Sequence, residues 1–478
     1  MTRPRMRHRG MHVGVLRQAA LTPEFSVKRR SWYQTLKGAD RALKVLIGYL
    51  RTGRRPATLP EGEPLLGVIP FTCAHPDEFP VRIPKALQDV LEELVKHGVV
   101  PEPTVTVAEW RFLLKKVERN EAVGPDGSIY GRKTYEQLDL WWAASLFNSL
   151  TTLIWARFGK RPRVAKLPNQ VVIGIVGDWG TGFQVRYQGR NPAFKVMRSL
   201  LAQRPDYIVH LGDVYYSGTP NDPFFAHPFE ERNNLIRCWP RAHAGGRSFT
   251  LNSNHEMYSL GRGYFYDALG APAFKVQNRT SYFLLQNAHW QIFGLDSAYA
   301  SPDRATFMDG SLHPDQIAWL KKVRDPRRRS IVMTHHNPLS IYGKNTKTSP
   351  LWAQLEQGFG RRQPDYWYWG HIHNGIVYEC AGRDVAARNK TKARCIGHSA
   401  IPFGFAWGLT RPETLLAAAP GAMPSAFQPI ETVKYFAHER VPGTSYVKNG
   451  FAVLRLSGAA ISEEIYDEDG QLTWRGLD

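Results

Sequence analysis

Short runs of β-branched and aromatic residues begin near residue 170 and recur to the end of the chain. Runs of this composition, bounded by glycine and polar residues, are typical of strands. They read VVIGIVGD, YIVHLGD, RSFTLNSNHE, SYFLLQ, HWQIFGLDS, SIVMTHH and DYWYWGHIH. Helical patterns at 192–203 and 313–324 lie between them, and residues 450–474 alternate apolar and polar positions with glycine turns. The pattern therefore predicts an α/β fold that closes on antiparallel strands.

The chain before residue 165 has a different pattern. Residues 31–52 place apolar side chains on one helical face and cations on the other, and 84–98 has a second amphipathic pattern. The segment 138–158 is the most apolar, but Asp139 and Asn148 interrupt the span of about 20 residues that a membrane helix needs. We therefore expect a packed or interfacial helix there, within a mainly helical extension.

These patterns divide the chain into three expected regions. Residues 1–60 form a basic segment with an amphipathic helix, 61–168 a helical accessory region, and 169–478 the α/β domain. Most of the net charge of +20 lies in the first region, which contains 14 Lys and Arg residues and two acidic residues. Two partners fit this charge, an anionic membrane surface and nucleic acid. The alternative is a helix docked on its own domain, which we favour.

The four cysteines are far apart in sequence and show no C-x-x-C spacing. Isolated cysteines suit a reducing compartment, although a bridge between Cys380 and Cys395 stays open. The first residues lack the long apolar core of a secretory signal. We expect a cytoplasmic protein with membrane association as an option, and the sequence does not predict its oligomeric state.

Five of the apolar runs end in an Asp, Asn or His just after the last apolar residue. Because open α/β sheets build their sites at strand ends, these side chains are expected to meet. They are Asp178, Asp213, Asn254 with His255, His335 with His336, and His371 with His373. Mixed oxygen and imidazole ligands without a thiolate suit two transition metals such as Fe, Mn or Zn. A single motif of this kind is more often a turn or a packed histidine, but five in this order are hard to explain by packing.

At these residues the chain resembles the calcineurin-like metallophosphoesterase superfamily, whose motifs run D-x-H or GD-x-G, GD, GNH[DE], H and GH-x-H. The resemblance covers about residues 169 to 478 and implies two mixed β-sheets packed as a sandwich flanked by helices, with metals at one end. It implies that Asp213 bridges two ions, that Asp178 and His373 hold the first, and that Asn254, His371 and a histidine of the THH pair hold the second. We choose His335 over His336 for that last position.

The sequence departs from the family pattern at two positions. Ser253 stands where the third motif usually has glycine, which a tight turn accommodates if the backbone there is not left-handed. Gly180 stands where most relatives have the histidine of D-x-H. The purple acid phosphatase branch combines GD-x-G with GD-x-x-Y, and this chain has both. By that resemblance Tyr216 is a phenolate ligand of iron(III) in the first position, with Fe, Mn or Zn in the second; the alternatives are that Tyr216 packs or that Tyr215 points inward.

The resemblance implies a hydrolase of phosphoric esters, in which a metal-bound hydroxide attacks phosphorus. Asp213 then serves catalysis by bridging the ions, and His255, which is not a ligand in the family, protonates the leaving alkoxide. The ligand set does not distinguish a phosphomonoesterase from a phosphodiesterase, and we expect loops such as 217–246 to choose the substrate. The alternative function is a nucleic-acid or membrane-binding protein with a vestigial metal site.

Overall fold

The computed structural model describes the second of two compact units, which comprises residues 108–303 and 307–478. The described residues are 154–182, 192–222, 225, 229–302, 307–339, 350–360, 363–378, 391–401, 433–439 and 447–478, with the backbone of β1 (Ala122–Val123) and β2 (Ile129–Tyr130). The predicted basic segment and the predicted helices at 31–52 and 84–98 lie outside the described residues.

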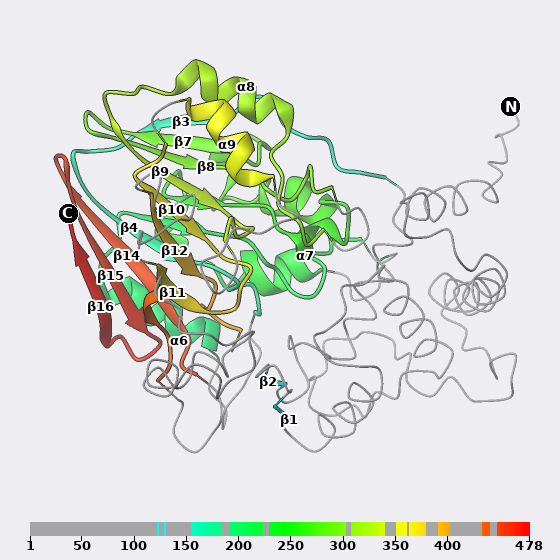
Figure 1. Ribbon diagram of the computed structural model, residues 1–478. Coiled ribbons are helices and arrows are strands. Elements are labelled where there is room, and N and C mark those ends of the chain that lie inside the picture. The colour runs from blue at the N-terminus through cyan, green and yellow to red at the C-terminus, as the bar shows by residue number, and fades with distance from the viewer. Residues whose placement is uncertain are drawn as a thin grey trace, which may run out of the picture. The chain divides into compact units, whose positions relative to one another are not determined.

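Two mixed β-sheets form the body of this unit (Figure 1). The larger sheet has the order β13-β11-β12-β10-β9-β8-β7-β3, and the smaller has the order β16-β15-β14-β4-β5-β6. Strands β8, β9, β10 and β12 of the larger sheet are parallel, as are β4, β5 and β6 of the smaller one. Strands β14, β15 and β16 pair antiparallel, so the predicted closing hairpins are confirmed.

Most strands coincide with apolar runs of the sequence. The larger sheet contains β3 (Arg163–Lys166), β7 (Phe283–Gln286), β8 (Trp290–Gly294), β9 (Arg329–Thr334), β10 (Tyr366–Trp369), β11 (Gly375–Tyr378), β12 (Lys392–Ile396) and β13 (Val433–Phe436). The smaller contains β4 (Gln170–Val176), β5 (Tyr207–His210), β6 (Ser248–Thr250), β14 (Gly450–Ser457), β15 (Ala460–Asp467) and β16 (Leu472–Leu477).

The core between the sheets is built from alternate residues of each strand. Ile173 and Ile175 of β4 pack there with Tyr366 and Tyr368 of β10, which come from the other sheet. Side chains of successive strand residues point to opposite faces, so Trp367 and Trp369 lie on the outer face of the larger sheet. The tryptophans at 367 and 369 are thus fully packed on that face.

Helices cover the outer faces of both sheets. The helix α6 (Pro192–Ala202) packs on the smaller sheet, and α8 (Pro314–Val323) and α9 (Leu351–Phe359) pack on the larger one (Figure 1). Shorter helical turns are η3 (Glu231–Ile236), η4 (Arg241–His243), α7 (Asn254–Met257), η5 (Gly263–Ala268) and η6 (Lys275–Gln277). The predicted sandwich of two mixed sheets with flanking helices is therefore confirmed.

Of the expected helix at 138–158, residues 138–153 lie outside the described residues, and only its last five are described. Residues 154–158 are not helical, because the Ala156 N–H donates to Leu260 O at 3.0 Å instead of to a carbonyl four residues earlier. The Trp155 ring packs edge-on against Tyr299, and β3 follows as an edge strand before residue 169. No helix among the described residues is long and apolar enough to cross a membrane. Cys395 is a buried free thiol, so the alternative of a bridge to Cys380 is not formed.

Candidate metal centre

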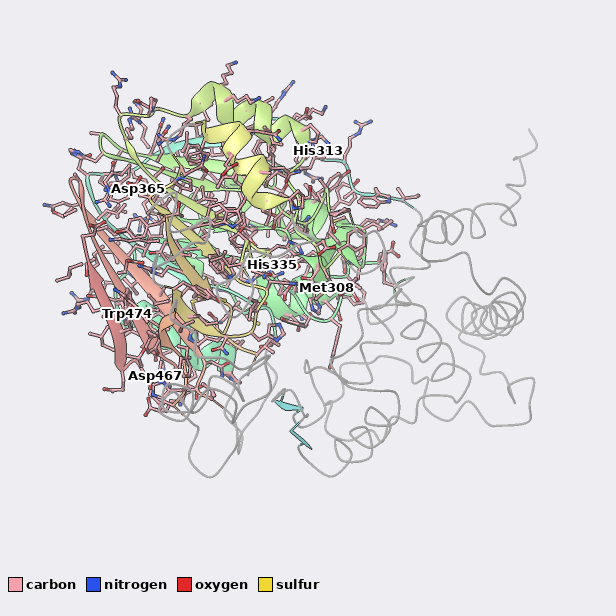
Figure 2. The ribbon with its side chains drawn as sticks, viewed as in Figure 1. Met308, His313, His335, Asp365, Asp467 and Trp474 are labelled. Carbon is pink, nitrogen blue, oxygen red and sulfur yellow. The ribbon has the colours of Figure 1, made fainter. Side chains whose placement is uncertain are left out.

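The polar residues predicted at strand ends come together at one end of the sandwich. We call Asp178, Asp213, Asn254, His335, His371 and His373 the acceptor cluster; they follow β4, β5, β6, β9 and β10. Figure 2 labels His335 of this cluster beside Met308, whose sulfur lies 3.6 Å from Asn254 Nδ2. Since β4 and β5 are parallel in one sheet and β9 and β10 in the other, their carboxyl ends bring these side chains to one place.

Unusual backbone torsions aim three of these side chains into the cluster. Asp178, Asp213 and His371 have φ of 57°, 76° and 64°, a left-handed conformation that non-glycine residues adopt where the surrounding structure holds them. Ser253, by contrast, is extended at φ −135°, as its replacement of glycine required. Its hydroxyl accepts from the His255 N–H and so caps the helical turn that carries Asn254.

The first part of the cluster surrounds Asp213 Oδ2. The His373 Nε2 atom lies 3.9 Å from this oxygen and 3.4 Å from Asp178 Oδ1. The Tyr215 hydroxyl donates to Asp213 Oδ2 at 2.8 Å and lies 2.9 Å from His373 Nε2. The Asp178 carboxylate is fixed from behind by the His371 N–H, at 3.1 and 2.9 Å from its two oxygens.

The second part surrounds Asp213 Oδ1. The His335 Nε2 atom lies 3.2 Å from this oxygen and 2.7 Å from Asn254 Oδ1. The His371 Nδ1 atom lies 3.2 Å from both Asn254 Oδ1 and His335 Nε2. One carboxylate, that of Asp213, therefore takes part in both halves.

The hydrogen-bond partners of His335 and Asn254 indicate that their acceptor atoms face each other in this second part. His335 Nδ1 donates to the carbonyl of Leu211 at 3.0 Å, which leaves a lone pair on Nε2 when the ring is neutral. The ring is neutral because burial lowers the pKa of His335 to about 3. Asn254 directs its amide nitrogen to Tyr258, so its oxygen is the atom that faces His335. Asp213 Oδ1 has no hydrogen-bond partner although its residue is 1% exposed.

Asp178 and Asp213 need a nearby positive charge if both side chains are to be ionised together. Burial, and then the neighbouring Asp213, raise the pKa of Asp178 well above its usual range. Burial opposes ionisation of Asp213 as well, but the surrounding imidazoles and hydrogen bonds from the His373 and Asp178 side chains hold the pKa of Asp213 well below its usual range. Buried lone pairs and carboxylates that converge without a donor between them are what a metal cation satisfies. The residues of the cluster therefore fit the metal ions that the sequence motifs imply.

The phenol of Tyr215 contacts Asp213, and this geometry favours Tyr215 over Tyr216, the tyrosine that the sequence predicts as a ligand. Tyr216 contributes its backbone: its N–H donates to Glu230 at 2.6 Å and its carbonyl accepts from His255 Nδ1 at 2.5 Å. The spacing GD-x-x-Y selects the tyrosine three residues after Asp213, whereas the phenol that reaches Asp213 belongs to the tyrosine two residues after it. Burial, and then Asp213, raise the pKa of the Tyr215 phenol well above its usual range, so it ionises only beside a strong cation.

The two neighbouring histidines of the fourth motif have different surroundings. His335 directs Nε2 at Asp213 and Asn254, as described above. His336 lies 2.9 Å from the Ser297 hydroxyl through Nδ1 and donates from Nε2 to Phe307 O at 2.7 Å. Both ring nitrogens of His336 thus have protein partners, and this geometry favours His335 as a ligand.

His255 lies at the edge of the cluster without joining it. Its Nδ1 donates to the Tyr216 carbonyl, which leaves Nε2 facing Asp213 Oδ2 at 4.0 Å. Burial lowers the pKa of His255, while Asp213 opposes this shift. In a ring held through Nδ1, Nε2 is the nitrogen that would take up and release a proton.

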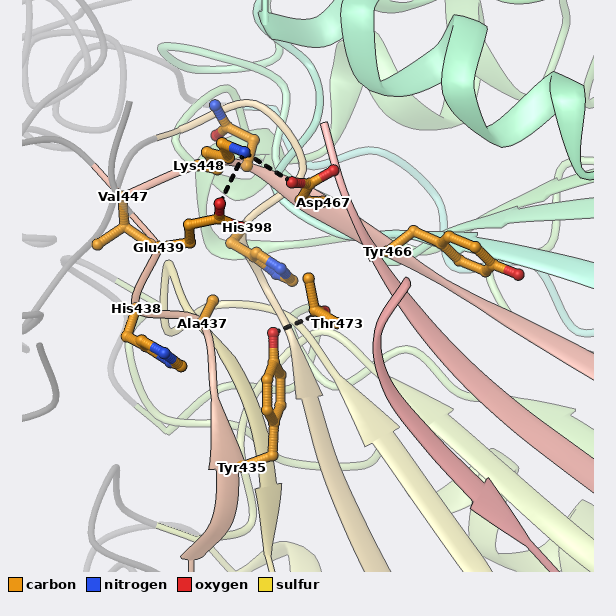
Figure 3. A pocket seen from close by; sticks show the side chains of 11 residues that line it. His398, Tyr435, Ala437, His438, Glu439, Val447, Lys448, Tyr466, Asp467 and Thr473 are labelled. Atoms are coloured by element: carbon orange, nitrogen blue, oxygen red, sulfur yellow. Dashed lines mark hydrogen bonds and ion pairs between the residues drawn. The ribbon is translucent and has the colours of Figure 1, made fainter. Parts of the chain in front are cut away.

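A separate small cavity lies at the same end of the sheets, near the start of β14 (Figure 3). It is lined in part by His398, Tyr435, Lys448, Asp467 and Thr473, and Lys448 forms ion pairs with Glu439 and Asp467. A cavity of about 10 Å³ accommodates one water molecule, so it is not a substrate site.

A family comparison agrees with the geometry of the cluster. Residues 171–375 match the family model of the calcineurin-like phosphoesterases, a range that contains every residue of the acceptor cluster together with Tyr215, Tyr216 and His255. No curated protein matches the chain.

Three solved structures show a weaker likeness. A purple acid phosphatase from yellow lupin (Lupinus luteus) seeds is 14% identical, with 65% of this chain and 54% of that chain covered and a TM-score of 0.38. A protein of Streptococcus pneumoniae TIGR4 described as a predicted phosphoesterase is 9% identical, with 65% and 98% covered and a TM-score of 0.27. Vacuolar Protein Sorting 29 from Cryptosporidium parvum is 15% identical, with 65% and 97% covered and a TM-score of 0.27. This chain thus spans about half the length of the purple acid phosphatase, and at these scores none of the three bears on its chemistry.

Proposed function

We propose that this chain, which belongs to the calcineurin-like metallophosphoesterase superfamily through residues 171–375, is a dinuclear metal-dependent hydrolase of phosphoric esters. The observation that carries the proposal is the convergence of Asp213 Oδ1, which is buried without a hydrogen-bond partner, with Asn254 Oδ1 and the lone pair of His335 Nε2. A metal cation placed among these atoms would satisfy all three acceptors at once.

The two halves of the cluster suggest two ion positions. Asp178, His373 and Tyr215 would hold the first ion, and Asn254, His335 and His371 the second, with Asp213 shared between them. When bound, two such cations supply an activated water and neutralise phosphate oxygens.

The ligand residues set the net charge of the proposed metal site, and His255 supplies a proton to the leaving group. Asn254 is a neutral ligand, so the carboxylates of Asp178 and Asp213 do not cancel the charge of two cations, and an anionic phosphate ester is attracted. His255 would give the Nε2 proton of its imidazolium form to the departing oxygen and return to the neutral ring, whose remaining proton stays on Nδ1 at the Tyr216 carbonyl.

We also propose iron(III) at the first position and Fe, Zn or Mn at the second. A phenol beside two carboxylates is a hard oxygen ligand, and a trivalent ion is the cation that best lowers its raised pKa. The complete set of ligands speaks against the alternative of a binding protein with a vestigial metal site.

The test is hydrolysis of p-nitrophenyl phosphate and bis-p-nitrophenyl phosphate by protein depleted of metal and then loaded with Fe, Mn or Zn. We expect turnover of at least one ester that depends on added metal, and its loss in Asp213→Asn. Protein that holds two ions and turns over neither ester, nor any of a wider panel of phosphate esters, contradicts the proposal.

A further inference from the structure

Glu230 lies 14 residues beyond Tyr216, at the entrance of η3, and is 2% exposed. Its carboxylate accepts three backbone N–H groups from the turn that follows Asp213: Tyr216 at 2.6 Å, Ser217 at 2.8 Å and Thr219 at 3.3 Å. A further hydrogen bond runs in the opposite direction, from the Glu230 N–H to the Thr219 hydroxyl at 3.1 Å. A buried carboxylate bound by several amides of one loop fixes the shape of that loop.

One of these amides belongs to the same peptide group that orients His255. The Ser217 N–H and the Tyr216 carbonyl are the two ends of a single planar peptide unit. The N–H end donates to Glu230 Oε2, and the carbonyl end accepts from His255 Nδ1 at 2.5 Å. The carboxylate, the peptide and the imidazole thus form one chain of hydrogen bonds.

Hydrogen bonds linked in this way strengthen one another. A negative charge at the N–H end of a peptide polarises it and makes its carbonyl a stronger acceptor. A stronger acceptor at Tyr216 keeps the proton of His255 on Nδ1 and leaves Nε2 as the nitrogen that faces Asp213 at 4.0 Å. The turn held by Glu230 also carries Tyr215, whose hydroxyl reaches Asp213 Oδ2.

We propose that Glu230 is a positioning residue for proton transfer, which acts on His255 through the Tyr216–Ser217 peptide and fixes its tautomer and orientation. The proposal rests on the proposed function in one respect, the role of His255 as the acid for the leaving group. Glu230 is not one of the residues proposed to hold the metal ions.

The experiment compares Glu230→Gln with the wild-type enzyme on esters whose leaving groups differ in basicity. An acid matters for a poor leaving group such as phenolate or an alkoxide, and much less for p-nitrophenolate. We expect kcat for phenyl or alkyl phosphate esters to fall by about 10- to 100-fold, with bound metal unchanged. The kcat for the p-nitrophenyl ester should change by less than about threefold. In protein that already carries His255→Ala, adding Glu230→Gln should not change the ratio of the kcat values for esters with poor and good leaving groups.

Two further variants separate positioning from folding. Thr219→Val removes the bond that Thr219 accepts from the Glu230 N–H and should give a weaker change in the same direction. Glu463→Gln is the matched control, because Glu463 is also buried, at 4% exposure, but binds Arg394 instead of the turn after Asp213. It should lower the melting temperature without any dependence on the leaving group.

A second readout is independent of catalysis. In protein labelled with ¹⁵N-histidine, the His255 resonances, assigned by their absence in His255→Ala, should report protonated Nδ1 in the wild type and a mixture of tautomers in Glu230→Gln. An unchanged tautomer together with an equal loss for all leaving groups overturns the proposal. Inactive wild-type protein with two bound ions overturns the proposed function instead, and the tautomer measurement then still decides the role of Glu230.

Discussion

Replacing Gly180 by alanine is expected to disable the metal centre although it removes no ligand. The Gly180 N–H donates to Asp213 O at 3.0 Å, and its carbonyl accepts from the Tyr215 N–H at 3.0 Å, so the backbones after β4 and β5 are in direct contact. A Cβ at position 180 would lie 2.4 Å from Asp213 O and 2.7 Å from Val214 Cα.

The size of the effect follows from these distances. Ordinary contact begins at 3.4 Å, so the Asp213 carbonyl must move by about 1 Å, and the obstructing atoms are backbone that cannot rotate away. Overpacking of this kind costs about 1–3 kcal/mol of folding stability. A shift of about 1 Å in a reacting group costs roughly 100-fold in rate, and here the carboxylate shared by both halves of the cluster is displaced.

The assay measures metal content, kcat and melting temperature of Gly180→Ala on one preparation. We expect fewer than two ions per chain, activity reduced by roughly 100-fold, and a lower melting temperature. Gly180→His should behave no better, since its Cβ meets the same atoms, although histidine is the residue that most relatives have there.

Gly360→Ala is the matched control. No atom lies within 4 Å of the position that a Cβ would take there, but the φ of 70° strains an alanine. The expected cost is about 1 kcal/mol of stability with unchanged metal content and kcat. Wild-type activity and metal content in Gly180→Ala would refute the reasoning that this contact positions Asp213.

The remaining predictions concern other histidines and the tyrosines. Iron-loaded protein should show a visible tyrosinate-to-iron band that Tyr215→Phe abolishes and Tyr216→Phe spares; the reverse result restores the sequence-based assignment. His335→Ala should reduce bound metal to about one ion per chain while His336→Ala retains two, as counted by elemental analysis. Burial lowers the pKa of His398 to about 3 from 6.5, so the unfolded state binds this proton first and the free energy of unfolding falls as pH drops from 6.5 toward 3. That loss reaches about 1.4 kcal/mol per pH unit. In His398→Gln the free energy of unfolding, measured by denaturant titration at several pH values, should depend less steeply on pH.

Features that depend on local pattern could be predicted from the sequence. The apolar runs identified the main strands of both sheets, and their ends named the side chains that the structure brings together, because strand direction alone decides where these ends meet. Strand β3 was missed, since its four residues RVAK are an exposed edge with no apolar run. The non-helical path of residues 154–158 was missed as well, because it depends on Leu260, which is distant in sequence.

Features that depend on distant residues could not be predicted. The choice between Tyr215 and Tyr216 depends on the shape of the turn after Asp213, and Glu230 sets that shape from 14 residues away. Glu230 itself stands in the charged stretch FEER, where a glutamate normally indicates a solvated helix start. Its burial and its three amide donors are visible only in the folded chain.

The central claim is that the acceptor cluster holds two metal ions which make this chain a phosphoesterase. The most direct measurement titrates metal-depleted protein with Fe, Mn or Zn while the bound ions per chain and the rate of phosphate ester hydrolysis are followed together. The account predicts that activity appears as occupancy approaches two ions per chain and that Asp213→Asn loses both. Full activity in metal-depleted protein, or two bound ions without hydrolysis of any phosphate ester, would contradict it.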